Sequence, residues 1–251
     1  MKTKKSLGQN FFINRNLCEQ ITNIILEQTP DLLVEIGPGT GSFTSFLKEN
    51  YSGKMLLIEK DDALAAELRR VYPEIDIQNS DFLEYNLNEL NEYKEKKILF
   101  WGSLPYNVSK PIIRKIISSP LFNSTCYFII QKEVAEKYIA KEPNNNLLAV
   151  ETTIYADVKK LFDISPDSFR PRPKVTSSFV SFTPKENIED ELKEKSFVKF
   201  LQASFSQPRK TLKNNLRNFS IEYDSEIEEL LSKRPQHLSL DEFSLLFRKV
   251  K

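Results

Sequence analysis

The sequence predicts an α/β protein, with a doubly wound parallel sheet followed by a small all-helical C-terminal domain. Three observations support this prediction. Short apolar runs alternate with segments of helical periodicity, the first run ends in a glycine-rich turn, and no strong strand pattern follows residue 184. Strands that alternate with helices favour right-handed crossovers, so the carboxyl ends of the parallel strands share one edge, where ligands bind.

Each predicted element rests on its own pattern of apolar residues. Strands are predicted at residues 32–36, 54–58, 75–77, 97–101, 126–130 and 179–182, and helices at 15–28, after Phe43, at 63–68 and at 109–117. Pro184 ends the last strand, and the polar run 185–195 follows it. We therefore predict a sheet domain over residues 1–183 and a helical domain over residues 184–251.

Composition narrows the class of protein. The 40% hydrophobic and 28% charged content predicts a globular chain with a sizeable core. A membrane partner is not expected, because no run of about 18 apolar residues is present. The basic N-terminus lacks the apolar segment of a signal peptide, so we expect a cytoplasmic protein.

The charge distribution is more informative than the net charge of +1. Basic residues gather in three clusters: Lys2, Lys4 and Lys5; Arg170, Arg172 and Lys174; and Arg209, Lys210, Lys213 and Arg217. Clustered bases in a neutral chain predict a positive face for phosphates. For any single cluster, an ordinary solvated charge run is the alternative.

Chemically distinctive residues follow four of the predicted strands. Gly37, with Gly39 and Gly41, forms a G-x-G-x-G turn that lets the backbone approach a ligand closely. The third glycine of a dinucleotide fingerprint is absent, which favours a nucleoside that carries an amino-acid tail. Glu59 suits the two hydroxyls of a ribose, and Asp81 suits an adenine amine. Alternatively, Glu59 is an exposed acid and Asp81 a helix N-cap.

The tetrad Ser103-Leu104-Pro105-Tyr106 follows the fourth predicted strand. It separates an enzyme that binds a nucleoside with an amino-acid tail from one that binds a dinucleotide. The amine on C6 of adenine is a poor nucleophile, because its lone pair is delocalised into the ring. The side chain of Ser103 and the carbonyl of Leu104 can accept its two hydrogens, while Pro105 stiffens the turn. Tyr106 offers a flat face on which a base can stack. A Pro-Tyr turn that merely closes the strand is the alternative.

Taken together, these motifs resemble one family, the ribosomal RNA adenine N6-dimethyltransferases, over nearly the whole chain. The resemblance is carried by residues 5–12, 34–41, 58–59, 81, 102–107, 131–135, 169–175, 209–212 and 238–243. It implies a Rossmann-like class I methyltransferase sheet, with S-adenosylmethionine as the methyl donor. Within the family, Gly37-Pro38-Gly39 and Gln131-Lys132-Glu133 resemble the housekeeping branch, which acts on the small-subunit rRNA.

The resemblance also implies roles for individual residues. The cofactor pocket would be lined by Asn10, Phe12, Gly37, Gly39, Glu59, Asp81 and Ser103. Glu35 would brace the glycine loop and the methionine end of the cofactor. Tyr106 and Phe169 would sandwich the target adenine. The implied reaction dimethylates two adjacent adenosines in the 3′-terminal hairpin loop of 16S rRNA, in a pre-30S particle, by a monomeric enzyme.

Two departures and two alternatives accompany this interpretation. Ser103 stands where the family usually has asparagine, and the loop 143–147 is shorter than the usual basic segment. The alternatives are a large-subunit methyltransferase that confers macrolide resistance and a non-catalytic assembly factor with the same fold. No metal site is expected, since the single His237 lies in the helical tail.

Overall fold

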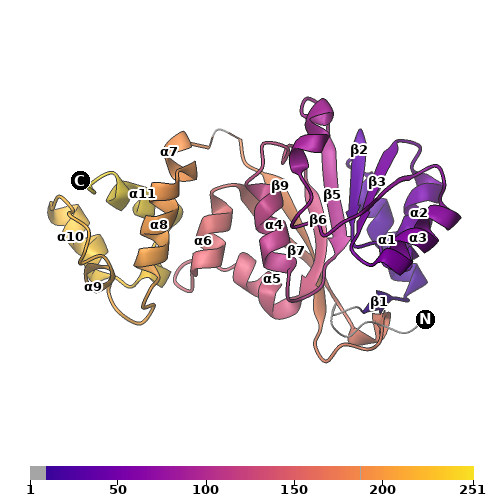
Figure 1. Cartoon of the computed structure of the whole chain (residues 1–251). Helices are drawn as coiled ribbons and strands as arrows, with labels where there is room; N and C mark the ends of the chain where they lie inside the picture. The colour runs from indigo at the N-terminus through magenta and orange to yellow at the C-terminus, as the bar shows by residue number, and fades with distance from the viewer. Residues whose placement is uncertain (1–9, 187) are drawn as a thin grey trace. The chain divides into compact units, whose positions relative to one another are not determined.

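The computed structural model describes residues 10–186 and 188–251, which divide into two compact units (Figure 1). The first comprises the residues up to Ala135 together with Lys159–Pro184, and the second comprises Glu136–Val158 and Lys185–Lys251. The sequence-based boundary near residue 184 left the segment 136–158 in the sheet domain. That segment groups with the second unit because Val150 and Ile154 pack into its hydrophobic core.

A seven-stranded sheet in the order β4-β3-β2-β5-β6-β9-β7 belongs to the first unit, except for the start of β7, which groups with the second. The strands are β2 (Leu32–Ile36), β3 (Lys54–Glu59), β4 (Asp76–Asn79), β5 (Ile98–Ser103), β6 (Cys126–Gln131), β7 (Ala156–Ile164) and β9 (Ser177–Pro184). Neighbours from β4 to β6 pair in parallel, and β9 runs antiparallel to β6. The predicted strands are therefore present, in an α/β sheet.

The connections of the sheet place its ligand crevice. From β2 the chain proceeds outward to β3 and β4, then returns to β5 on the other side of β2 and continues to β6. The helices α2 (Ser42–Asn50) and α3 (Asp62–Val71) lie on one side of the sheet, and α4 (Ser109–Ile117) lies on the other (Figure 1). The strand order reverses between β2 and β5, which is where open α/β sheets bind ligands.

The hydrophobic core beneath this crevice is rich in aromatic rings. Helix α1 (Arg15–Leu26) contributes Ile21, and α2 contributes Phe43, to a cluster that also contains Leu33 of β2 and Trp101 of β5. The rings of Phe43 and Trp101 meet edge to face at 4.6 Å between centroids. This packing fixes the strands whose ends carry the polar residues.

Strand β7 and the pair formed by β1 and β8 were not predicted. Strand β7 lies at the edge of the sheet beside β9, and its charged residues interrupt the apolar pattern that marks the central strands. In addition, β1 (Phe11–Phe12) pairs antiparallel with β8 (Phe169–Arg170), which brings the chain near residue 11 beside Phe169. The β1–β8 pair forms part of the wall of the ligand crevice.

The second unit is built from short helices around its own core. They are α6 (Leu147–Thr153), α7 (Asp190–Lys193), α8 (Lys195–Ser204), α9 (Leu212–Asn215), α10 (Ser225–Ser232) and α11 (Leu240–Phe247). Phe197, Phe200 and Phe243 are fully buried in this core. Ser239 and Glu242 form a capping box at the start of α11, which satisfies backbone N–H groups that a helix leaves unpaired. Among the described helices, none is long and apolar enough to cross a membrane.

Candidate active site

A cavity opens at the carboxyl ends of β2, β3, β4 and β5. Its walls come from residues that follow these strands, from the chain around β1 and from β8. The lining residues are Asn10, Phe11, Ile36, Gly37, Gly39, Ile58, Glu59, Lys60, Ser80, Asp81, Phe82, Ser103, Leu104, Pro105, Tyr106, Asn107, Val108, Ile112 and Phe169. The four strand-end residues that the sequence singled out thus line one cavity.

The glycine turn after β2 presents bare backbone to the cavity. Gly37 and Gly39 have φ angles of 65° and 60°, in the left-handed region that favours glycine. Among the described residues other than its two chain neighbours, no heavy atom lies within 4 Å of the position that a Cβ of Gly37 would occupy. A Cβ on Gly39 would come within 3.2 Å of the ring of Phe11. The turn therefore leaves room for a ligand against its backbone.

Glu59 fastens this turn to the next strand. Its carboxylate accepts hydrogen bonds from Gly39 N at 3.0 Å and from Asp61 N at 2.8 Å, one on each oxygen. Burial raises the pKa of Glu59, and backbone hydrogen bonds from Asp61, Gly39 and Lys60 oppose that shift. Each carboxylate oxygen retains a second lone pair. Glu59 can therefore hold the turn and still accept hydrogen bonds from two hydroxyls of a ligand.

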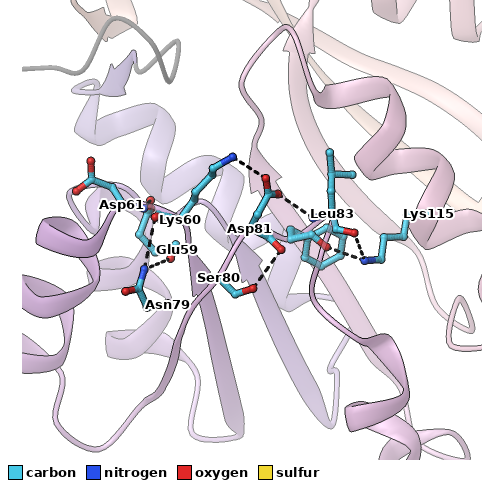
Figure 2. A network of polar contacts seen from close by, with 9 residues as sticks. Glu59, Lys60, Asp61, Asn79, Ser80, Asp81, Leu83 and Lys115 are labelled. Atoms are coloured by element: carbon cyan, nitrogen blue, oxygen red, sulfur yellow. Dashed lines mark hydrogen bonds and ion pairs between the residues drawn. The ribbon is translucent and has the colours of Figure 1, made fainter.

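Asp81 lies in a network of charged side chains beside the cavity (Figure 2). Its Oδ2 accepts from Lys60 Nζ at 2.6 Å, and its Oδ1 accepts from Leu83 N at 2.9 Å. Burial disfavours the charge on Asp81, but the hydrogen bonds from Lys60 and Leu83 lower its pKa overall. The Asp81 carboxylate, which is the expected acceptor for an adenine amine, is therefore ionised. Lys60 donates a hydrogen bond to one of its oxygens.

The tetrad at the end of β5 is anchored by backbone and side-chain hydrogen bonds. Leu104 N donates to Ile129 O of β6 at 3.0 Å, and the hydroxyls of Tyr106 and Ser177 lie 2.8 Å apart. Burial raises the pKa of Tyr106, while the bond to Ser177 opposes the rise. The phenol thus remains neutral at physiological pH, as suits a ring that stacks on a base.

Phe169 also lines the cavity, but Phe12 does not. In the β1–β8 pair Phe12 lies opposite Phe169, and their ring centroids are 5.0 Å apart. Phe12 is buried and also packs on Phe43 at 4.7 Å, whereas its neighbour Phe11 faces the cavity. Adjacent residues of a strand point to opposite sides. Phe11 therefore lines the cavity and Phe12 packs behind it, and a role for Phe12 in cofactor binding stays a prediction.

Glu35 is likewise outside the cavity lining, beneath the glycine turn. It is buried in β2, and its carboxylate accepts a hydrogen bond from the Thr44 hydroxyl of α2 at 2.7 Å. Burial raises the pKa of Glu35 to about 7, although the Thr44 bond opposes this. Glu35 braces the helix that follows the turn, and it does not reach the cavity. Its role at the methionine end of the cofactor stays a prediction.

Residues without a strong sequence signal also shape the site. Lys60 and Phe11 line the cavity, Ser177 holds Tyr106, and Lys115 lies beside Asp81 in the network of Figure 2. No three His, Cys, Asp or Glu side chains within residues 10–186 and 188–251 are grouped as a metal site would require.

The basic clusters lie on the surface where they are described. Residues 2–5 fall outside the described residues. Arg170, Arg172 and Lys174 are exposed, and Arg172 pairs with Asp167 at 2.7 Å. The basic residues of the second unit between positions 209 and 217 are also exposed. Both described clusters are accessible to phosphates.

Comparison with known proteins identifies the family. The model of the family described as ribosomal RNA adenine dimethylase matches residues 1–242. The ribosomal RNA small subunit methyltransferase A of Pelagibacter ubique (strain HTCC1062) is 37% identical over 258 residues, which cover 99% of this chain and 97% of that protein.

Two solved structures share the fold. A dimethyladenosine transferase from Plasmodium falciparum has a TM-score of 0.73 at 23% identity, with 90% of this chain and 94% of that chain covered. The 23S rRNA methyltransferase ErmE has a TM-score of 0.74 at 20% identity, with 96% and 99% covered.

The sheet and the cavity at its switch point, together with these structures, define the fold of a class I methyltransferase. The chain belongs to the ribosomal RNA adenine dimethylase family. It is accordingly an rRNA adenine dimethyltransferase, and S-adenosylmethionine is the methyl donor that the family implies. The fold class, the family and the enzyme class predicted from the sequence are confirmed.

Proposed function

We propose that this enzyme dimethylates two adjacent adenosines in the 3′-terminal hairpin loop of 16S rRNA, within a pre-30S particle in the cytoplasm, and acts as a monomer. The observation that carries the proposal is the single cavity that joins the strand-end acids to the tetrad and Phe169. The small subunit is favoured because the Pelagibacter ubique relative, which aligns with 99% of this chain, is named as a small-subunit methyltransferase.

The residues present fit the proposed methyl donor. Gly37 leaves open space where a side chain would stand, which suits a ligand laid against the turn. Glu59 retains lone pairs for the ribose hydroxyls, and Asp81 is an ionised acceptor for the adenine amine. Asn10 lies on the same wall as Phe11. When bound, S-adenosylmethionine supplies an electrophilic methyl group on its sulfonium.

The tetrad would hold the acceptor base. The Ser103 hydroxyl and the Leu104 carbonyl accept the hydrogens of the adenine N6, which favours the tetrahedral nitrogen that attacks the methyl group. Tyr106 and Phe169 would stack on the two faces of a base rotated out of the RNA. Ser103 has a shorter side chain than the family's usual asparagine, which leaves room for an adenine that already carries one methyl group.

The substrate assignment can be tested on purified subunits. Tritiated S-adenosylmethionine would be supplied with 30S or 50S subunits from a strain that lacks the small-subunit methylation. We expect label in the 30S rRNA only. Label in 50S rRNA would support a large-subunit methyltransferase instead. Stable binding to 30S particles without any transfer would support a non-catalytic assembly factor.

A further inference from the structure

Lys115 of α4 places its ammonium among three backbone carbonyls of one loop. Its Nζ donates to Phe82 O at 2.8 Å, to Leu83 O at 2.8 Å and to Tyr85 O at 2.6 Å. A lysine ammonium has three N–H donors, so this loop can engage all of them. Figure 2 shows Lys115 and Lys60 approaching this loop and Asp81 from different elements.

The loop is a single helical turn that begins at Asp81. The backbone N–H groups of Glu84 and Tyr85 both donate to Asp81 O at 2.9 Å, and Leu83 N donates to the Asp81 carboxylate. An isolated turn leaves its last carbonyls without partners, and a cation is the group best suited to satisfy them. Asp81 therefore caps one end of the turn, and Lys115 binds the other.

The same ammonium touches the cavity wall through an aromatic ring. Lys115 Nζ lies 5.4 Å from the ring centroid of Phe82, which is buried and lines the cavity next to Asp81. Phe82 in turn packs edge to face on Phe100 of β5, at 6.3 Å between centroids. Lys115 thus contacts both the backbone and the side chain of the wall beside Asp81.

Helix α4 connects Lys115 to the tetrad on the other side of the cavity. The helix starts at Ser109, whose hydroxyl donates to Tyr106 O at 3.3 Å, and Val108 N donates to Pro105 O at 3.1 Å. The tetrad therefore runs into α4 through hydrogen-bonded turns. Partial desolvation lowers the pKa of Lys115, and the charge of Asp81 opposes the shift.

We propose that Lys115 is a positioning residue, which ties the turn carrying Asp81 and Phe82 to the helix that follows the tetrad. Its effect is to orient the Asp81 carboxylate, so that the enzyme recognises the amine of the cofactor's adenine. This inference rests on the proposed placement of that adenine beside Asp81. Lys115 itself does not line the cavity.

The test compares the cofactor product with an analogue whose base is hypoxanthine, which differs from adenine at the C6 substituent and in the proton on N1. S-adenosylhomocysteine carries the amine, and S-inosylhomocysteine carries an oxygen in its place. The Kd of each is measured by calorimetry for the wild type, for Lys115→Met and for the control Lys110→Met. Lys110 lies on the same helix with an exposed side chain. The ratio of the two Kd values does not depend on the fraction of protein that is active.

We expect the preference for S-adenosylhomocysteine to fall roughly fivefold in Lys115→Met and to stay at the wild-type value in Lys110→Met. Asp81→Asn should lose the same preference, and adding Lys115→Met to it should change the ratio little further. If Lys115→Met does not fold, Lys115→Arg serves for the same comparison, with a smaller loss in the same direction.

A wild-type ratio in a folded Lys115 variant, whatever its melting temperature, would overturn the proposal, because the lysine would then only stabilise the fold. Failure of the wild-type protein to bind S-adenosylhomocysteine would overturn the proposed function, and this inference with it.

Discussion

The two sides of the cavity are held in place by different forces. Around Asp81 the contacts are ionic: Lys60 pairs with the carboxylate, and Lys115 binds the carbonyls of the following turn. Around Tyr106 they are neutral, with one bond between hydroxyls and the rings of Phe12 and Phe169 packed edge to face. Ionic contacts at an open cavity respond to salt and pH, whereas packed rings respond to changes of shape.

This difference matches what each side would bind. Under the proposed function, the Asp81 side recognises the polar edge of a small cofactor, where a placed charge gives selectivity. The Tyr106 side receives a base from RNA, and a flat neutral ring stacks on it whether or not it already carries a methyl group. Substitutions on the two sides should therefore alter different steps.

The largest expected effect is that of Tyr106→Ala. Loss of the stacking ring should lower kcat/KM for the RNA roughly a hundredfold. The Kd for S-adenosylhomocysteine should stay near the wild-type value, because Tyr106 is assigned to the base. Single-turnover methylation and calorimetry measure the two quantities. An equal loss of cofactor binding would refute the stacking role.

Glu59→Gln should weaken cofactor binding, which Tyr106→Ala is expected to leave unchanged. The amide would set N–H donors against the backbone donors of Gly39 or Asp61, so the Kd for S-adenosylhomocysteine should rise roughly thirtyfold. Because burial raises the pKa of Glu59, acidification protonates its carboxylate, and wild-type affinity should fall as the pH drops through that raised pKa. Calorimetry across pH should show no such fall in Glu59→Gln. A shared pH profile would contradict the assignment.

Ser177→Ala should have a smaller effect, because it removes only the hydroxyl that anchors the ring of Tyr106. Without its partner hydroxyl, Tyr106 is held by packing alone, so kcat should fall about fivefold with little change in cofactor affinity. Tyr106→Phe should show the same loss, and the double variant should add little to it. The matched control is Ser178→Ala, since Ser178 bonds to Asp163 instead. An equal loss in the control would argue against a specific role for Ser177.

Lys60→Met should have the smallest effect, and it should strengthen cofactor binding. Lys60 occupies Oδ2 of Asp81, so its removal frees an acceptor, and cofactor affinity should rise about threefold. Added salt should strengthen binding to the wild type by screening this exposed pair, and should not strengthen binding to Lys60→Met. Weaker binding by the variant in titrations at two salt concentrations would show that Lys60 assists the cofactor.

Part of this structure could be predicted because its signals are local. Buried parallel strands such as residues 32–36 appear as apolar runs, and their ends mark the crevice. Strand β7 escaped prediction because charged residues, with Lys159 and Lys160 adjacent, interrupt its apolar pattern. The residues 136–158 join the second unit through contacts of Val150 and Ile154 with a core that is distant in sequence.

The residues of the site could likewise be predicted where their signals are local, but not where they depend on long-range contacts. Gly37, Glu59, Asp81 and Ser103 each follow a strand, so topology alone brings them together. Phe12 was assigned to the pocket by resemblance alone, and a two-residue strand has no pattern from which Phe11 could be predicted to face the cavity. Lys115 reaches carbonyls about thirty residues away, a contact that only the folded loop creates.

We propose above all that one cavity brings a methyl donor and an rRNA adenine together. The most direct measurement is mass spectrometry of digested 16S rRNA after incubation of the purified enzyme with unmethylated 30S particles and S-adenosylmethionine. We predict N6,N6-dimethyladenosine at two adjacent positions of the 3′-terminal hairpin loop, formed roughly a hundredfold more slowly with Tyr106→Ala at limiting RNA. Unmodified adenosines in that loop, with methylation elsewhere or nowhere, would contradict it.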